Sequence, residues 1–193
     1  MDFSERVKRY ADRIRAMRPA RIAPAATVRV EVPDGAWAAA SDDERLARVC
    51  RAAAAALTVA PVLAGRYDGH KGLVVDERPT LWVGAEGGRS WREASAGLLD
   101  DRAARRDRLP AGGGLEVLDL SGLGVGDWRG AVVSPRVARL VVLAAALVPG
   151  PADCAAMRVF PLALDFDQRL LDARSAAHFL GALSAGLQRI GGE

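Results

Sequence analysis

Residues 160–172 read Phe-Pro-Leu-Ala-Leu-Asp-Phe-Asp-Gln-Arg-Leu-Leu-Asp, and with the segment that follows they decide the fold. The residues before Asp167 extend an apolar run from position 156 that is typical of a buried strand. Over residues 175–190, apolar side chains recur at helical spacing. The sequence therefore predicts a strand that ends at Asp167 and passes through a short turn into a closing helix.

The composition fits one domain. The chain has 193 residues, of which 50% are hydrophobic and 26% are charged, so we expect a single compact domain over residues 1–193. The net charge is only +3, and no basic stripe is interleaved with aromatic residues, which argues against a nucleic-acid partner. Cys50 and Cys154 lack the spacing of a metal site or a disulfide framework, so we expect neither.

Nothing in the chain predicts membrane association. The N-terminal segment mixes charged and apolar residues where a targeting peptide would have a continuous apolar run. The apolar run over residues 140–149 is about half of the ~20 residues that a membrane-spanning helix needs. We therefore expect a soluble protein of the reducing cytoplasm.

Periodicity and turn residues give a coarse order of further elements. Apolar residues at helical spacing predict an amphipathic first helix, and Ser41 before three acidic residues is a typical helix N-cap. The alternation of strands and helices without repeats predicts an α/β or α+β layered sandwich. The expected elements are helices at 3–17, 41–57, 90–105 and 175–190, a strand at 27–32, a hairpin of 72–76 with 80–83, and strands at 115–120, 137–147 and 156–167.

Three segments, in order along nearly the whole chain, resemble one known family. Residues 167–173, Asp-Gln-Arg-Leu-Leu-Asp-Ala, are similar to the Asp-His-Arg-x-x-Asp-Gly of the 2-oxoacid dehydrogenase acyltransferases (the E2 catalytic domain) and of chloramphenicol acetyltransferase. Residues 118–124, Leu-Asp-Leu-Ser-Gly-Leu-Gly, with Val-Val-Ser-Pro-Arg-Val-Ala at 132–138, resemble the family's Phe-Thr-x-Ser-Asn-x-Gly and Ile-Ile-Asn-Pro-Pro-x-x-Ala. Ala-Asp-Arg-Ile at 11–14 is similar to its Ala-Glu-Arg-Met.

The resemblance implies a fold and an assembly. It implies the chloramphenicol acetyltransferase-like fold, a mixed sheet packed by helices, in a homotrimer. In the family, a channel between neighbouring subunits admits coenzyme A from one end and the acyl-bearing dihydrolipoamide from the other. Lipoyl and subunit-binding domains are not expected here.

The resemblance also assigns roles to individual positions. Gln168 stands where the family has its general base, a histidine, and Ser121 falls on a hydroxyl that steadies the oxyanion from the neighbouring subunit. Asp172 falls on an aspartate that the family holds in a buried pairing with an arginine, which Arg13 would supply here. Asp172 and Arg13 are therefore expected to be structural residues at the site.

The chemistry of the predicted site depends on which side chain can accept or donate a proton. A carboxamide cannot serve as a general base, although Gln168 can still orient a carbonyl by hydrogen bonding. Asp165 and Asp167 lie two apart on one strand and hence on one face, so Asp165 is a candidate acid or base if that face lines the channel. The alternative is that both carboxylates are solvated or paired with arginines. Trp128 and Phe166 are candidate substrate-binding residues, although a buried position in the core would also explain Trp128.

Other motifs point away from catalysis. His178 is expected on a helix surface, and His70 lies in a glycine-flanked loop. No Gly-x-Ser-x-Gly segment indicates a serine hydrolase, and the glycines at 122, 124 and 126 precede neither a lysine nor a helix that would make a phosphate loop.

Three functions stay open at this level. The leading hypothesis is a repurposed acyltransferase fold whose interface channel binds a small apolar or acyl-bearing molecule other than lipoamide. It would promote a cyclisation, elimination or rearrangement in specialised metabolism. One alternative is a residual acyltransferase that takes acyl groups from coenzyme A or a carrier protein. The other is a noncatalytic subunit that assembles with a true acyltransferase, so whether the protein is an enzyme stays open. No metal or cofactor is expected; coenzyme A enters by resemblance alone.

Overall fold

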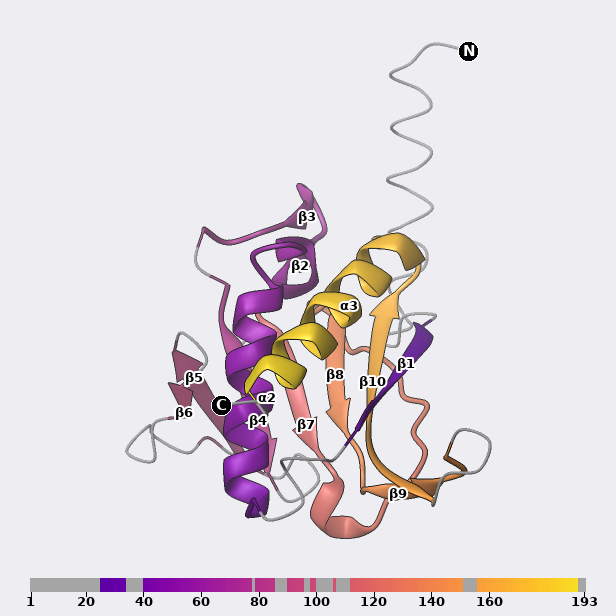
Figure 1. Ribbon diagram of the computed structural model, residues 1–193. Helices are drawn as coiled ribbons and strands as arrows, with labels where there is room; N and C mark the ends of the chain where they lie inside the picture. The colour runs from indigo at the N-terminus through magenta and orange to yellow at the C-terminus, as the bar shows by residue number, and fades with distance from the viewer. Residues whose placement is uncertain are drawn as a thin grey trace.

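The computed structural model describes residues 25–33, 40–77, 79–85, 90–95, 98–99, 106, 112–150 and 156–190. Within these ranges the chain forms a mixed sheet, a two-stranded ribbon and two α-helices (Figure 1). The elements in chain order are β1 (Ala25–Pro33), α2 (Asp42–Ala56), the 3-10 helix η2 (Pro61–Ala64), β2 (Arg66–Asp68), β3 (Gly72–Val74), β4 (Leu81–Ala85), β5 (Ser90–Ser95), β6 (Leu98–Leu99), β7 (Leu115–Asp119), the 3-10 helix η3 (Ser121–Leu123), β8 (Ala138–Val142), β9 (Ala146–Val148), β10 (Met157–Asp167) and α3 (Ala173–Ile190).

The described part of the main sheet has the strand order β1-β10-β8-β7-β4-β5-β6, and β9 pairs with the start of β10. Strands β4, β7 and β8 run parallel, and the pairs on either side of them are antiparallel. Strands β7 and β8 are covered on both faces, which explains why their sequences are nearly continuous apolar runs. The long strand β10 joins β1, β8 and β9 into one layer.

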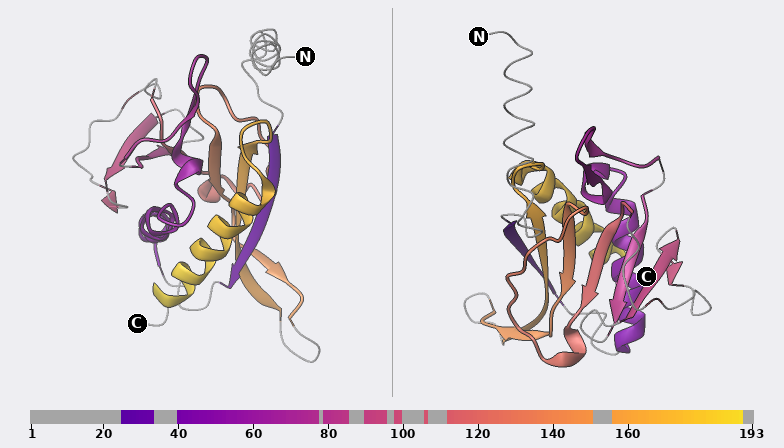
Figure 2. Two further views of the ribbon diagram at one scale, coloured as in Figure 1. Left: turned by 90° about the horizontal axis from the view of Figure 1, so that it is seen from above. Right: turned by 180° about the vertical axis from the view of Figure 1, so that it is seen from behind.

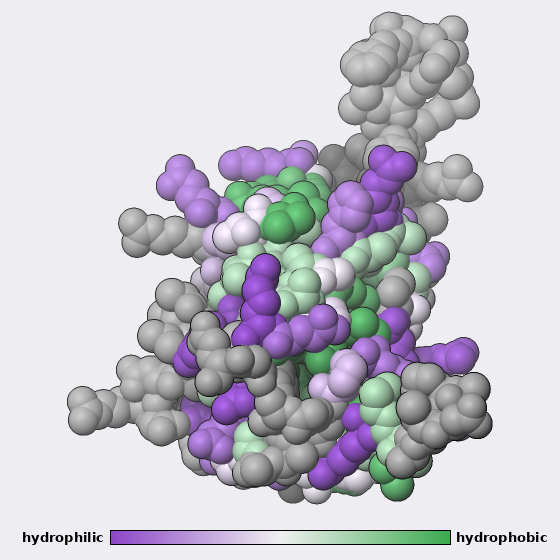
Figure 3. All heavy atoms as spheres, in the orientation of Figure 1, coloured by the Kyte–Doolittle hydropathy of each residue, from purple (hydrophilic) through white to green (hydrophobic). Residues whose placement is uncertain are grey.

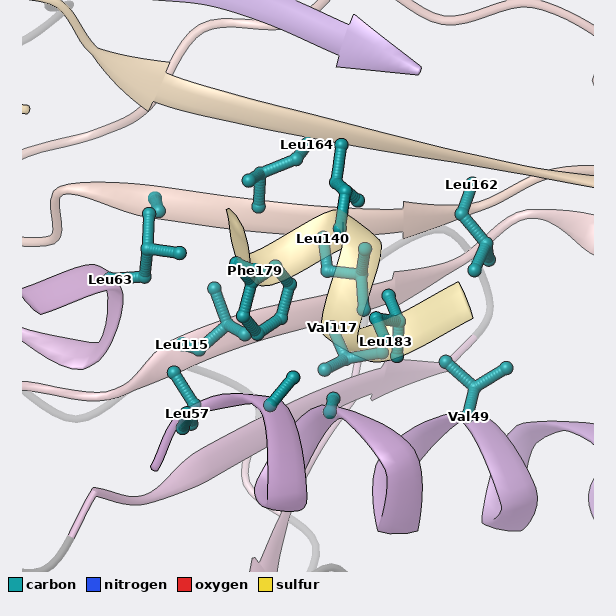
Figure 4. Packing of buried hydrophobic residues seen from close by; sticks show 14 of the residues in the cluster. Val49, Leu57, Leu63, Leu115, Val117, Leu140, Leu162, Leu164, Phe179 and Leu183 are labelled. Atoms are coloured by element: carbon teal, nitrogen blue, oxygen red, sulfur yellow. The ribbon is translucent and has the colours of Figure 1, made fainter. Parts of the chain in front are cut away.

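Both helices lie on one face of the sheet (Figure 2). Helix α2 begins at a capping box, in which the Ser41 hydroxyl accepts from the Glu44 N–H and the Glu44 carboxylate accepts from the Ser41 N–H. The apolar sides of α2 and α3 meet strand residues such as Val117, Leu140 and Leu164, all of which point into the space between helices and sheet (Figure 4). This layer is the main core.

The sheet face away from the helices, called the open face below, carries a second and smaller apolar cluster. Val125 and Trp128, from the segment after β7, pack against that cluster. Because side chains alternate along a strand, β10 sends Phe166 into the main core and Asp165 to the open face. The buried members of the cluster are Trp82, Trp91, Leu118, Leu120, Val141, Leu143 and Ala163.

Most of the predicted elements are confirmed. The strands at 27–32, 115–120 and 156–167, the helix capped by Ser41 and the closing helix are all present. The strand predicted at 137–147 is divided into β8 and β9. The small residues of α2 permit close packing, since a Cβ on Gly186 of α3 would lie 3.4 Å from that of Ala52.

The hairpin predicted from 72–76 and 80–83 is wrong. Strand β3 pairs with β2 instead, because the Asp68 carboxylate accepts hydrogen bonds from the backbone N–H groups of His70 and Lys71 and closes a tight turn there. Strand β4 pairs with β5 and β7. The segment between β3 and β4 therefore connects two different sheets.

The helix predicted at 90–105 is also wrong, because its described residues include β5 and β6. Trp91 is buried on the open face and Ala94 is buried in the main core. Two apolar residues three positions apart thus imitate helical spacing although they lie on opposite sides of one strand.

One further prediction, the helix expected at 3–17, falls on residues outside the described ranges. Among the helices that the structure describes, none is both long enough and apolar enough to span a membrane.

Candidate functional site

A row of polar side chains crosses the open face. The strand register places Thr27 of β1 beside Asp165 of β10, Asp165 beside Arg139 of β8, Arg139 beside Glu116 of β7, and Glu116 beside Trp82 of β4. Asp165 and Glu116 are 0% and 1% exposed. Buried carboxylates are costly unless they are paired, so their contacts decide what this row can do.

Both oxygens of Asp165 accept hydrogen bonds from neutral donors. The Thr27 hydroxyl donates to Oδ1 at 2.5 Å, and the Trp128 indole N–H donates to Oδ2 at 2.8 Å. Trp128 thus reaches the sheet from the segment after β7, and a Cβ on Gly130 would lie 2.5 Å from its Nε1, so only glycine fits against the ring. Asp165 holds one side chain from β1 and one from this segment.

A cavity of 600 Å³ opens beside this arrangement. Its walls combine two arginines and an aspartate with an aromatic ring, a hydroxyl and a small apolar floor. Asp165 lies behind Thr27 and Trp128 and is not itself part of the wall. The lining residues are Thr27, Arg29, Asp127, Trp128, Arg129, Gly130 and Ala163.

Glu116, Arg136 and Arg139, called the buried ion cluster below, fix the segment between β7 and β8 to the sheet. Arg139 Nε donates to Glu116 Oε2 at 2.6 Å, and Arg136 Nε lies 3.6 Å from Oε1. Arg139 also donates to the Ala131 carbonyl at 3.2 Å. Burial lowers the pKa of Arg136, and the Glu116 carboxylate opposes that shift.

Gln168 stands in the turn directly after β10, as predicted, and its side chain is exposed in the single chain. The Asp167 carboxylate before it is buried and binds Arg169, with Arg169 Nε at 2.9 Å from Oδ1 and NH2 at 2.6 Å from Oδ2. Backbone N–H groups of Leu170 and Leu171 donate to the Asp167 carbonyl. Asp167 therefore has the arginine pairing considered from the sequence, and it fixes the turn that presents Gln168.

Ser121 opens η3, at the far end of the sheet from Gln168. Its hydroxyl and its backbone N–H both reach Asp119 Oδ1, at 2.7 and 2.9 Å. In the strand register, Asp119 of β7 is paired with Val142 of β8, and Val142 is paired with Leu162 of β10. Leu162 precedes Gln168 by six residues. At about 3.3 Å per strand residue, this offset separates the two ends by roughly 20 Å. Within one chain, Ser121 and Gln168 do not share a site.

Asp172 caps the last helix. Its carboxylate accepts from the Ser175 N–H at 2.7 Å, and these hydrogen bonds from Ser175 hold the pKa of Asp172 below its usual value. The pairing with Arg13 stays a prediction, because Arg13 lies outside the described residues.

The structure separates the two predicted substrate-binding residues. Trp128 lines the cavity, whereas Phe166 is 1% exposed within the main core on the other face of β10 and does not reach the cavity. His178 is exposed on its helix, as expected, and His70 is exposed in the turn between β2 and β3. Among the described residues, no three potential metal ligands are grouped together.

Sequence reasoning missed the buried ion cluster. The available signal was a charged residue inside an apolar strand, Glu116 in Leu-Glu-Val-Leu and Arg139 in Ala-Arg-Leu-Val. Such a residue must find a partner when both faces of its strand are covered. The partner, however, follows only from the parallel register of β7 and β8.

Comparison with solved structures confirms the expected fold. A probable dihydrolipoamide acetyltransferase from Listeria monocytogenes is similar with a TM-score of 0.70 and 21% identity, over 95% of this chain and 92% of that one. A dihydrolipoamide acetyltransferase (E2p) from Azotobacter vinelandii is similar with a TM-score of 0.68 and 16% identity, over 95% of this chain and 88% of that one. A chloramphenicol acetyltransferase is similar with a TM-score of 0.57 and 14% identity, over 86% of this chain and 89% of that one. No protein-family model and no curated protein matches the sequence. At these identities the likeness establishes the chloramphenicol acetyltransferase-like fold.

Proposed function

We propose that this protein is a repurposed member of the acyltransferase fold that binds a small apolar or acyl-bearing molecule in a channel between the subunits of a homotrimer. It would act on that molecule without a histidine base. The Azotobacter vinelandii acetyltransferase was investigated for the catalytic roles of a serine, a histidine and an asparagine, the last two four positions apart. By the resemblance of the sequence motifs, Ser121, Gln168 and Asp172 would be the matching positions here, and Gln168 and Asp172 are likewise four apart.

The position of Gln168 in the fold is the main support for this proposal. It follows β10 directly, in a turn fixed by Asp167 and Arg169, with its side chain exposed. A carboxamide at this point can donate to a carbonyl and accept from an N–H or hydroxyl, but it cannot remove a proton. Loss of a general base typically costs ~10²–10⁴ in rate. The ordinary transfer of an acyl group to a thiol is therefore disfavoured, and orientation of a substrate is retained.

The separation of Ser121 from Gln168 supports an oligomeric site. The two side chains lie at opposite ends of one sheet, roughly 20 Å apart by strand rise. A channel that uses both must take one from each of two copies, which a ring of three copies does at every interface. The homotrimer remains part of the proposal.

Asp165 is a poor substitute for the missing base. Its two oxygens already accept from Thr27 and Trp128, and it lies behind the cavity wall. This arrangement favours chemistry that needs positioning and exclusion of water, such as a cyclisation, elimination or rearrangement, over residual acyl transfer.

Thiol release from acyl-coenzyme A tests the proposal. We expect no release by the wild type, and release by Gln168→His in the presence of a thiol acceptor, because the substitution restores a base to an intact channel. The double variant Gln168→His with Ser121→Ala should lose that gain. Release by the wild type that Ser121→Ala abolishes would instead establish a residual acyltransferase.

The oligomeric state forms the second part of the test. Sedimentation of the purified chain should give one trimeric species. If the chain sediments as a monomer, or forms an oligomer only when it is mixed with another acyltransferase, the result would favour the alternative of a noncatalytic subunit.

A further inference from the structure

The cavity on the open face has the size of a small-molecule site within a single chain. Its 600 Å³ falls within the roughly 300–1,000 Å³ of such sites. Neither Ser121 nor Gln168 lines it. An inference about this cavity therefore goes beyond the proposed function.

One arginine at the cavity wall, Arg129, can bind an anionic group. Arg29 lies 3.7 Å from Asp127 and 3.3 Å from Glu31, so its charge is offset. Arg129 is exposed and has no ion pair with the residues that the structure describes. Of the two guanidinium groups at the wall, Arg129 is thus the one that has no carboxylate partner among the described residues, and a guanidinium binds a carboxylate through two parallel hydrogen bonds.

The aromatic wall favours a flat apolar body. Trp128 already donates its N–H to Asp165, so it offers a ligand its ring and no hydrogen bond. The backbone of Gly130 lies against that ring and restricts its movement. Ala163, 1% exposed, adds a small apolar floor from β10. Flat groups stack on an indole in offset geometry.

We propose that this cavity binds a small organic acid, with its carboxylate on the Arg129 guanidinium and a flat apolar body against Trp128. Asp165 is a positioning residue for this site, because it fixes the orientation of the Trp128 ring and of the Thr27 hydroxyl without lining the cavity. A polyanion is disfavoured, since Asp127 lies at the same wall with a largely exposed carboxylate.

The indole N–H signals of the ¹⁵N-labelled full chain report binding directly. The chain has four tryptophans, and Trp128→Phe identifies the signal of Trp128 by its disappearance. Three probes separate charge from shape: cinnamate has both features, cinnamamide has the same flat body without charge, and acetate has the charge without the body. We expect cinnamate to shift the Trp128 signal saturably, with an affinity at least about tenfold above either partial probe.

Two variants test the assigned contacts. Arg129→Gln, at an exposed position, should reduce cinnamate affinity about tenfold and bring it level with cinnamamide, whereas Arg174→Gln, on the far side of the sheet, should leave it unchanged. Asp165→Asn should move the Trp128 indole proton signal upfield in the free protein, which Arg129→Gln should not do. The inference is overturned if cinnamate leaves the signal in place, if cinnamamide binds equally well, or if Arg129→Gln retains the affinity.

Discussion

The indole N–H of Trp128 donates to Oδ2 of Asp165 at 2.8 Å, across 37 residues of sequence. This hydrogen bond ties the segment after β7 to strand β10 and holds the Trp128 ring in the wall of the cavity. The donor is neutral and the acceptor is a buried carboxylate. Bonds of this kind are among the stronger hydrogen bonds in proteins, so the contact is a suitable place to measure what holds the open face together.

A double-mutant cycle should detect this bond. Asp165→Ala and Trp128→Phe each remove it, so their effects on the free energy of unfolding should overlap by about 1.5–3 kcal/mol. Urea unfolding of the wild type, both single variants and the double variant measures the overlap. The same cycle with Trp91→Phe, a buried tryptophan elsewhere on the open face, serves as the control. Strict additivity of the Asp165 and Trp128 variants would contradict the assigned contact.

The buried ion cluster should make Glu116 far more important to stability than other glutamates. Glu116→Gln removes the carboxylate that contacts one buried and one partly buried arginine, and breaking a buried pair in this way typically costs about 3–5 kcal/mol. Glu93→Gln makes the same chemical change at an exposed position of β5, which is separated from β7 by β4. It should alter the urea midpoint little. Equal losses for the two variants would refute the role assigned to the cluster.

The fold could be predicted where the signals are local. Ser41 and Glu44 are three residues apart and specify the start of α2 by themselves, and the apolar run before Asp167 specifies β10. The errors arose where a strand has different neighbours on its two faces, as at Trp91 and Ala94, because the resulting pattern imitates a helix. The pairing of β4 with β7 joins residues more than 30 positions apart, and no local pattern encodes it.

The candidate site was predictable only in part. The motif located Gln168 and Ser121, but their separation depends on the antiparallel register of β8 and β10. Asp165 was recognised as an unusual carboxylate, yet its donors come from β1 and from the segment after β7. Phe166 is adjacent in sequence and lies in the main core, since consecutive strand residues face opposite ways.

The cap of α3 should make stability depend on pH through Asp172. The backbone hydrogen bond from Ser175 holds the pKa of Asp172 below its value in the unfolded chain. A lowered pKa stabilises the fold at pH values above the unfolded value of 3.8, and this stabilisation is lost as the pH falls through the lower folded value. The carboxamide of Asp172→Asn can still cap but does not titrate. The wild type should therefore lose stability relative to Asp172→Asn between about pH 5 and pH 2.

Urea midpoints measured at several pH values provide this comparison. Asp172→Ala removes the cap altogether and should be less stable than Asp172→Asn throughout, which separates loss of the cap from loss of the charge. A constant difference between the wild type and Asp172→Asn across the range would show that Asp172 does not titrate with folding.

Cys50 should be chemically inert in the folded protein. It is buried in α2 within the main core, and burial raises its pKa to about 12, with a further contribution from Asp119. The thiolate is the reactive form, and at about pH 8 only roughly one thiol in 10⁴ would be ionised. In a Cys154→Ser variant, which isolates the signal of Cys50, iodoacetamide should therefore give no labelling under native conditions and complete labelling in urea. Mass spectrometry reads both states, and native labelling at the denatured rate would mean that the core around α2 opens far more readily than its packing indicates.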